Sequence, residues 1–244
     1  MSFEFLFGPV ERLDESLTHL LEGAPLLVAL GIAFLLGLRH ASDPDHLVAV
    51  TSLLASEDSD HRDAARLGAW WGLGHATMLL AIGLPLIFLK SELPAWLETG
   101  AEKAVGVVIL VLGTRVIWKW AHGDYRTGAH SHHDHSHHHL RTGDPHRHQS
   151  VRTPAQAFGI GVVHGLAGTG AVVLLLIAAL PTQLEAAAAL ALFAPMSIVS
   201  MAACTTAFAW VLTRPVIEPV YRTVLIPALG VFGVLFGLWY VGLT

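Results

Sequence analysis

The chain has 244 residues, of which 53% are hydrophobic and 14% charged, and its formal net charge is -5 with His counted as neutral. This composition lies outside the range of soluble globular domains and predicts an integral membrane protein whose membrane part is the whole fold. The charge balance provides no basic stripe and argues against nucleic acid as a partner, and the single Cys204 excludes a disulfide framework.

Residues 1–23 form a predicted N-terminal interfacial segment. They are acidic and lack the basic start and small-residue cleavage site of a signal peptide, so we expect them to remain in the mature protein. Their spaced Phe and Leu residues indicate an amphipathic helix at the membrane surface, interrupted at Gly8-Pro9, and an ordinary lead-in segment is the alternative.

The remaining chain predicts an all-α membrane fold of about six transmembrane helices. Crossing a bilayer takes roughly 20 apolar residues, and six segments meet this length: 24–54, 64–89, 103–121, 154–180, 185–212 and 216–243. The first segment is too long for one straight helix and holds Pro44 beside charged residues. We therefore expect a break near His40, after which the chain returns as a half-helix.

A short internal repeat relates the two halves of the chain. Gly37-Leu38-Arg39-His40 and Gly161-Val162-Val163-His164 share the pattern G-x-x-H, and each lies in the first span of its half. Since three spans separate the copies, they run in opposite directions. The sequence therefore predicts two inverted three-helix repeats, residues 24–121 and 153–244, with the first helix of each interrupted, as in secondary transporters.

The positive charges predict the orientation. With six spans, ten Lys and Arg residues fall on one side of the membrane and only Arg12, Lys90 and Lys103 on the other. Because the richer side is normally cytoplasmic, we expect a multi-pass protein of the cell's inner membrane. Both termini are then outside and the loop at 122–152 is cytoplasmic.

The charges of GLRHASDPDH, residues 37–46, need a reason, because a charged side chain near the bilayer centre costs roughly 2.5–3.5 kcal/mol. Arg39 and Asp43 are spaced to neutralise each other, although Asp43 also counts as a candidate ligand. On an ideal helix His40, Asp45 and His46 would not share a face, but unwinding at Pro44 lets them converge. Two imidazoles and a carboxylate suit Ni²⁺, Co²⁺ or Zn²⁺ better than Mg²⁺ or Ca²⁺.

Two further His residues lie within predicted spans. His75 is flanked by Gly72, Gly74 and Ala76, which leave room for a close neighbour, and His164 has almost no bulky residue around it. Each is a candidate metal ligand, and a hydrogen bond between helices is the alternative for both.

The segment between the third and fourth spans is rich in His. Ten of the sixteen His residues lie in 121–148, among Asp and turn residues, which predicts a flexible, metal-binding tract that does not fold alone. An inserted purification tag would have more regular spacing. The tract would store ions or hand them to cytoplasmic metallochaperones of nickel or cobalt enzymes, and its accessory ligands would be His130, His132, His133, His135, His137, His138 and His139.

The run RHASDPDH, with His40, Asp45 and His46, together with WGLGHA at 71–76 resembles the signature of the nickel/cobalt transporter family. The second half, GVVHGLAGTGAVVLLL at 161–176, resembles the related UreH-like proteins. The resemblance implies Ni²⁺ or Co²⁺ as transported substrate and not as cofactor, no enzymatic activity, and His40, Asp45, His46 and His75 as essential residues. Pro44 stands where many members have Ala, and six spans are fewer than the eight of the uptake branch.

Four functions follow from these patterns. Uptake of Ni²⁺ or Co²⁺ is favoured, and the alternative is efflux, because related efflux proteins carry a His-rich loop in the middle of six spans. A transporter of sulfur-containing anions would prefer Arg and helix N-termini over paired Asp residues, and only Arg39 is present. A membrane HX4D acyltransferase would use His40 as base and Asp45 to orient it, but leaves His46 without a role.

Overall fold

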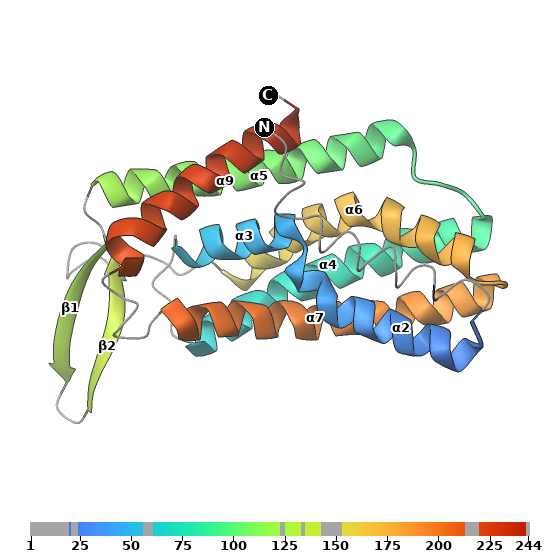
Figure 1. Ribbon diagram of the computed structural model, residues 1–244, viewed down its shortest axis with the longest axis horizontal. Coiled ribbons are helices and arrows are strands. Elements are labelled where there is room, and N and C mark those ends of the chain that lie inside the picture. Colours follow the sequence, from blue (N-terminus) through green and yellow to red (C-terminus); the bar gives the residue numbers. More distant parts are fainter. Residues whose placement is uncertain are drawn as a thin grey trace.

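The computed structural model describes residue 20 and residues 24–55, 61–122, 125–132, 135–142, 153–212 and 220–242. Its helices lie lengthwise beside one another in an elongated bundle, and a β-hairpin lies at one end (Figure 1). Four of the described helices are long and apolar enough to cross a membrane, and one bent helix pair would make a fifth. The predicted all-α membrane fold is therefore confirmed, with the hairpin as an addition to it.

Each of the six predicted spans falls on helical structure. The elements are α2 (Leu26–Arg39), the 3-10 turn η1 (His40–Ser42), α3 (Pro44–Ala55), α4 (His61–Leu89), α5 (Ala95–Ala121), α6 (Pro154–Ala179), α7 (Gln183–Leu212), the π-helical turn η2 (Tyr221–Leu225) and α9 (Ile226–Val241). The helices that could each cross a membrane are α4, α5, α7 and the continuous helix Thr223–Val241, which contains α9. The bent pair is α2 with α3. The count of six spans stays a prediction.

The first span is broken where the sequence predicts. Helix α2 ends at Arg39, η1 follows, Asp43 is extended with φ -63° and ψ 144°, and α3 starts at Pro44. The two helical parts are bent by 47° relative to each other. Proline pushes the preceding residue out of the α region and is itself tolerated at the first position of a helix. Pro44 therefore accounts for both the end of the first part and the start of the second.

The prediction that the first helix of the second half is also interrupted is wrong. Helix α6 runs from Pro154 to Ala179 as one α-helix, and a capping box of Thr153 and Gln156 fixes its start. Its central stretch is rich in glycine but holds no proline. Glycine lowers helix propensity yet keeps its backbone N–H, so the hydrogen-bond ladder continues where proline would have cut it.

Glycines bring α4 and α6 into backbone contact. A Cβ added at Gly74 would overlap the carbonyl oxygen of Phe158, and one added at Gly161 would overlap that of Trp71. Small residues at such crossings let membrane helices approach closely. The room that the sequence indicated beside His75 is thus filled by α6.

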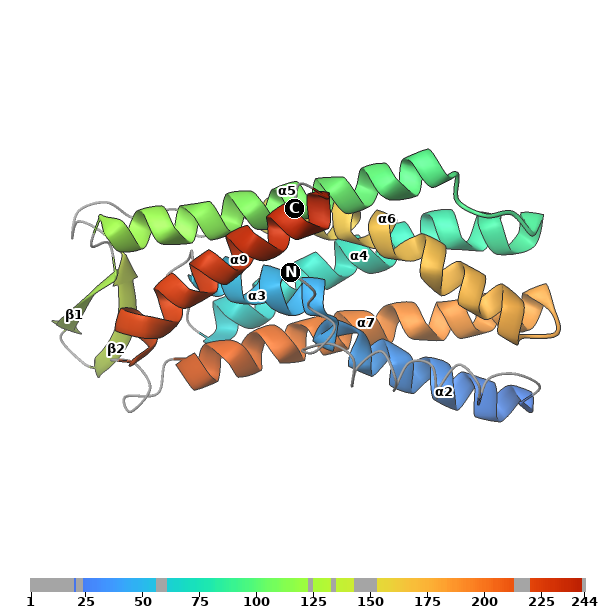
Figure 2. The same ribbon diagram turned by 45° about the horizontal axis from the view of Figure 1, so that its top comes forward.

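The two halves pack in corresponding ways. Helices α2 and α6 run in opposite directions along the bundle (Figures 1 and 2), and α2 packs against α7 as α6 packs against α4. At these interfaces a Cβ on Gly37 would lie 2.7 Å from the carbonyl oxygen of Phe193, while Gly161 abuts that of Trp71. The two inverted three-helix repeats stay a prediction.

The outer surface of the bundle is suited to lipid. Large apolar side chains such as Leu27, 83% exposed, point outward. Exposed tryptophans lie near the ends of the bundle, with Trp96 at the start of α5, Trp118 near its end and Trp210 near the end of α7. Such aromatic residues mark the two interfaces of a membrane. The chain is therefore a membrane protein.

The basic residues are divided between the two ends of the bundle. Arg62 and Arg66 lie in the first turns of α4 and Lys119 in the last turn of α5, at the end where the hairpin lies, whereas Lys90 follows α4 at the opposite end (Figure 1). This division agrees with the grouping read from the sequence. Which end faces the cytoplasm stays a prediction.

The His-rich tract has more structure than predicted. Strands β1 (Tyr125–His132) and β2 (His135–Thr142) form an antiparallel hairpin that pairs His130 with His137 and His132 with His135. The hairpin is regular structure that the sequence analysis did not predict, and its strand pairing satisfies backbone N–H and carbonyl groups whatever the side chains are. That the tract binds metal and does not fold alone stays a prediction. Of the predicted accessory ligands, His133 lies outside the described residues.

Among residues 1–23, the structure describes only Leu20. The predicted interfacial helix therefore lies outside the described residues.

Candidate metal site

Four histidines from four parts of the chain meet inside the bundle. His40 lies in η1, His46 in the first turn of α3, His75 in the middle of α4 and His164 in the middle of α6. All four are buried, with exposed fractions between 0% and 9%. The break in the first span places His40 and His46 on either side of an unwound segment, and the glycine contacts bring α4 and α6 together behind them. The structure thus assembles the four histidines that the sequence singled out within its spans.

Asp43 holds His40 from behind. Its Oδ2 lies 2.9 Å from Nδ1 of His40, and its Oδ1 accepts a hydrogen bond from the Arg39 guanidinium at 2.5 Å. A carboxylate at one ring nitrogen of a metal-binding His fixes the tautomer and orients the ring. The predicted pairing of Arg39 with Asp43 is present, and Asp43 lies behind His40 instead of within the groups of converging ligand atoms.

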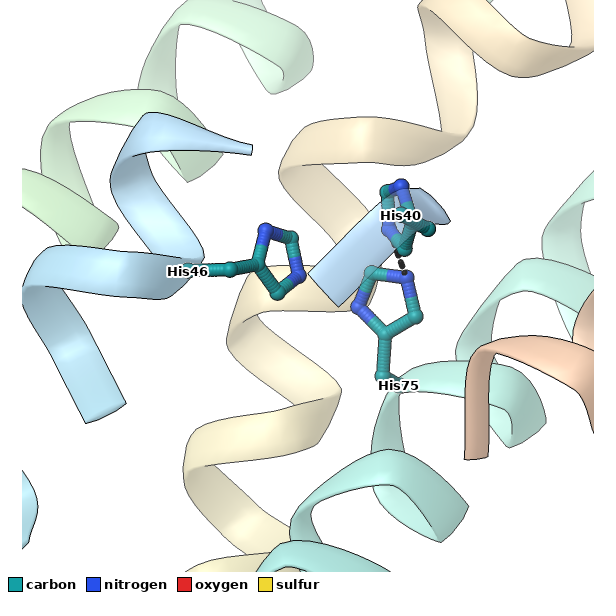
Figure 3. Close-up of side chains that lie close together, drawn as sticks. All are labelled: His40, His46 and His75. Carbon is teal, nitrogen blue, oxygen red and sulfur yellow. Dashed lines mark hydrogen bonds between the residues drawn. The ribbon is translucent and has the colours of Figure 1, made fainter. Parts of the chain in front are cut away.

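His40 and His75 are joined directly. Their Nε2 atoms lie 2.8 Å apart (Figure 3). With Nδ1–H of His40 donating to the Asp43 carboxylate, Nε2 of a neutral His40 is the acceptor and Nε2 of His75 donates. Both Nε2 atoms therefore point at one spot, where a cation would replace the shared proton.

His46 faces the same spot from α3. Its ring centroid lies 4.5 Å from that of His40 and 5.2 Å from that of His75. Its Nδ1 lies 3.1 Å from Oδ1 of Asp45, and its Nε2 has no hydrogen-bond partner among the described residues. One ligand atom from each of the three histidines lies within 4.8 Å of the others. We call His40, His46 and His75 the three-histidine group.

A second group overlaps the first. Asp45, His46 and His164 also bring one ligand atom each within 4.8 Å of one another. Oδ2 of Asp45 lies 3.4 Å from Nε2 of His164, a separation without hydrogen-bond geometry, and the rings of His46 and His164 are 4.7 Å apart. We call these three residues the Asp45 group. All six predicted ligands thus lie in or directly behind the two groups.

Two aromatic residues that the sequence analysis did not single out pack on the histidines. The ring of Trp71 lies 5.5 Å from both His46 and His164, and the ring of Phe193 lies 5.2 Å from His40. Trp71 stands four residues before the histidine of α4 and thus on the same helix face, which the sequence could have shown. Nothing in the sequence marks Phe193, because it is one apolar residue among many on α7.

Ser200 of α7 completes the broken segment. Its buried hydroxyl accepts a hydrogen bond of 3.1 Å from the backbone N–H of Ala41, in η1. A break in a membrane helix is tolerated only where other groups satisfy the freed backbone. Ser200 does this, and it too was missed, since serine in an apolar run gives no distinctive signal.

A cavity of about 270 Å³ leads to the site. Parts of α2, α6 and α7 form its largely apolar wall, and His40, Asp45 and His46 are among the polar residues that line it. His75 and His164 do not line the cavity. A cation that enters through it would therefore reach His40, Asp45 and His46 before His75 and His164.

Buried imidazoles and a carboxylate at a broken span, reached by a cavity, define a membrane protein that handles a transition-metal cation. The chain belongs to the NicO family, described as high-affinity nickel-transport proteins, whose family model matches residues 26–156. The resemblance noted in the sequence is thereby confirmed. This is a family of transporters and not of enzymes, which also confirms that the chain is no enzyme.

Similar proteins carry related names. The chain is 28% identical over 216 residues to the urease accessory protein UreH of Bacillus sp. strain TB-90, which covers 88% of this chain and 91% of that protein. It is 31% identical over 80 residues to the nickel transporter NixA of Staphylococcus aureus, and the match covers 31% of this chain and 24% of that protein. It is 34% identical over 90 residues to a high-affinity nickel transport protein of Cupriavidus necator, and the match covers 36% of this chain and 25% of that protein. No solved structure matches the chain significantly.

Proposed function

We propose that the chain carries Ni²⁺, Co²⁺ or both across the cell's inner membrane through the His and Asp side chains at the broken span. The observation that carries this proposal is the three-histidine group, in which the Nε2 atoms of His40 and His75 converge and His46 lies beside them. Imidazole nitrogens suit these borderline cations. Family membership and the names of two relatives support nickel in particular.

The site is built to bind a cation and release it again. Asp43 and Asp45 bring two negative charges close to the histidines, while Arg39 compensates Asp43. A divalent ion that leaves water for this site exchanges water oxygens for imidazole nitrogens and carboxylate oxygens and gains opposite charge. The ion is the substrate, and the protein needs no resident cofactor for this step.

Uptake is the favoured direction. A relative named as a urease accessory protein aligns with most of this chain, and supplying nickel to an enzyme inside the cell requires inward transport. On the cytoplasmic side, the His-rich hairpin would store ions or pass them to metallochaperones of nickel or cobalt enzymes. Efflux is the second candidate, favoured by the same hairpin if it collects excess ions for export.

The site counts against the two other functions considered. The only cation next to the broken segment, within the part of the chain that the structure describes, is Arg39, and Asp43 neutralises it, so no positive group is left to attract an anion. In an HX4D acyltransferase the Asp of the motif would orient His40. Here Asp43 does so instead, while Asp45 contacts His46 and His164.

Reconstituted protein tests the proposal. Proteoliposomes that hold the full chain should accumulate radioactive Ni²⁺ faster than empty liposomes, and unlabelled Co²⁺ should compete. Direction is then measured by uptake into whole cells against efflux from loaded vesicles. Vesicles that take up neither ion in either direction would overturn the proposal.

A further inference from the structure

We propose that the membrane site holds two adjacent ion positions that share His46, and that an ion passes between them by exchanging its other ligands. The first position is the three-histidine group and the second is the Asp45 group. This inference rests on the proposed function and deepens it, because it assigns a distinct position to His164.

The first step is the chemistry of His164. The residue is 1% exposed, and neither of its ring nitrogens has a hydrogen-bond partner among the described residues. A neutral imidazole always carries one N–H and one lone pair, and leaving both unpaired in the interior is unfavourable. Oδ2 of Asp45 lies 3.4 Å from Nε2 of this ring. A cation between the Asp45 carboxylate and the ring would take the lone pair of Nε2 and the negative charge of Asp45.

The second step is that the two groups overlap at one residue. His46 belongs to both, whereas His40 and His75 occur only in the first and Asp45 and His164 only in the second. The Nε2 of His46 is buried without a partner, and its ring lies 4.5 Å from His40 and 4.7 Å from His164. An ion held by His46 can therefore reach either set of ligands by a short movement.

The third step is charge. Two divalent ions on one imidazole would repel each other, and a neutral His46 has a single lone pair to offer. The two positions are therefore occupied in turn. The first offers only neutral nitrogen ligands, while the second adds the charge of Asp45, so the two differ in the free energy of the bound ion and the difference biases its movement.

The fourth step is the placement of the ligands on the helices. The positions differ by their deep ligands, His75 on α4 and His164 on α6, and neither lines the cavity. At the glycine contact the Cβ of an Ala at position 165 would lie 2.5 Å from the carbonyl oxygen of His75. The packing of α4 on α6 therefore fixes how far apart the two deep ligands lie.

Cobalt spectroscopy on the purified full-length protein tests the inference without relying on transport. Co²⁺ absorption reports the number and type of its ligands. We expect His75→Gln to leave a signal from the Asp45 group, His164→Gln to leave a different signal from the three-histidine group, and the double variant to lose both. The double variant also supplies the background of the His-rich hairpin. Asp45→Asn should resemble His164→Gln, because it too removes only the second position.

Transport then separates the two positions kinetically. We expect His164→Gln to lower the maximal rate of Ni²⁺ uptake at least about tenfold while the concentration for half-maximal rate changes less than about threefold, since the three-histidine group keeps all its ligands. Asp63→Asn, which changes an exposed carboxylate in the first turn of α4, is the control outside the site and should behave as wild type.

Three results would overturn the two positions. Loss of all site-bound Co²⁺ signal in either single variant that still elutes as a folded species would mean one undivided site. Identical spectra for the two single variants would also mean one undivided site. A wild-type rate in His164→Gln would show that His164 takes no part. If the wild-type protein bound Co²⁺ in two distinguishable ways but transported no ion, the proposed function would fail while the two positions stood.

Discussion

The Nε2 atoms of His40 and His75 lie 2.8 Å apart, although the two residues are separated by 35 positions in the chain. His40 sits in the turn that ends α2, and His75 is at the centre of α4, with no exposed surface. A buried contact of this kind between two imidazoles is of little use to stability alone, because an apolar pair would pack without unpaired nitrogens. The proposed function gives the arrangement a purpose, because a cation would bind both imidazoles.

His46→Ala should abolish transport, because His46 is shared by both ligand groups. Loss of a metal-ligand partner even outside the coordination shell costs roughly 10–100-fold in affinity, so we expect removal of a shared ligand to cost more than this. The protein should still insert and purify, since one imidazole is a small part of the packed interior. Uptake of radioactive Ni²⁺ and size-exclusion profiles check both points, and transport at the wild-type rate would remove His46 from the site.

Asp43→Asn should weaken metal binding by roughly 10–100-fold without abolishing it, because Asp43 orients His40 through Nδ1 and is not itself in either ligand group. Isothermal titration with Ni²⁺ measures the change. Asp63→Asn, an exposed carboxylate in the first turn of α4, is the matched control and should leave the affinity unchanged. A complete loss of binding in Asp43→Asn, equal to that of His46→Ala, would instead make Asp43 a direct ligand.

Gly161→Ala should destabilise the protein by about 1–3 kcal/mol, the usual cost of inserting a methyl group into a filled interior. The added Cβ would overlap the backbone carbonyl oxygen of Trp71, which cannot rotate away. Since the change pushes α6 from α4, it should also weaken Ni²⁺ binding.

Gly159→Ala is the matched control on the same helix. No atom lies within 4 Å of a Cβ at that position, so the alanine should be neutral or slightly stabilising. Thermal unfolding of both variants in the same detergent compares them. Equal unfolding temperatures for the two variants would show that the close contact between α4 and α6 is absent in the protein.

Metal binding should weaken as the pH falls. Neutral imidazole binds Ni²⁺ and imidazolium does not, and ordinary histidine has a pKa of about 6.5. Protons therefore compete with the ion for the imidazole nitrogens. Because bound metal stabilises the neutral imidazole, the histidines become protonated only at a lower pH than in the absence of metal. Titrations with Ni²⁺ between about pH 8 and pH 5 should show a steady loss of affinity. A constant affinity over this range would mean that histidines are not the ligands.

Much of the site can be predicted from the sequence because its chemistry is unusual for a membrane. Charged residues next to Pro44 and histidines inside apolar segments have few explanations other than a functional site, and the proline itself predicts the break. The glycines around His75 predict a close neighbour, although they do not show that this neighbour is α6. These signals are local, so a single sequence carries them.

The remaining features depend on contacts between distant parts of the chain. The role of Asp43 behind His40 follows from the exact conformation of the unwound segment, because either Asp43 or Asp45 could have faced it. Ser200 and Phe193 look like ordinary residues of an apolar helix until α7 is placed against the break. The continuity of α6 was mispredicted because glycine clusters permit a break without enforcing one, unlike proline.

Deleting residues 130–139, which removes most of the His-rich hairpin, should leave transport at saturating Ni²⁺ largely intact. The hairpin connects the end of α5 to the start of α6, and shortening a connection changes the entropy of loop closure only slowly. The membrane ligands are all retained, so the deletion should lower the number of ions bound per protein and the uptake at low Ni²⁺. Because a His-rich tract accepts many divalent ions, the shortened protein should discriminate among metals at least as sharply as the intact one.

Replacing the histidines of 130–139 by Ser keeps the length of the connection and separates loss of ligands from loss of chain. Complete loss of transport at saturating Ni²⁺ in both variants, in protein shown to be folded, would place the hairpin in the path of the ion.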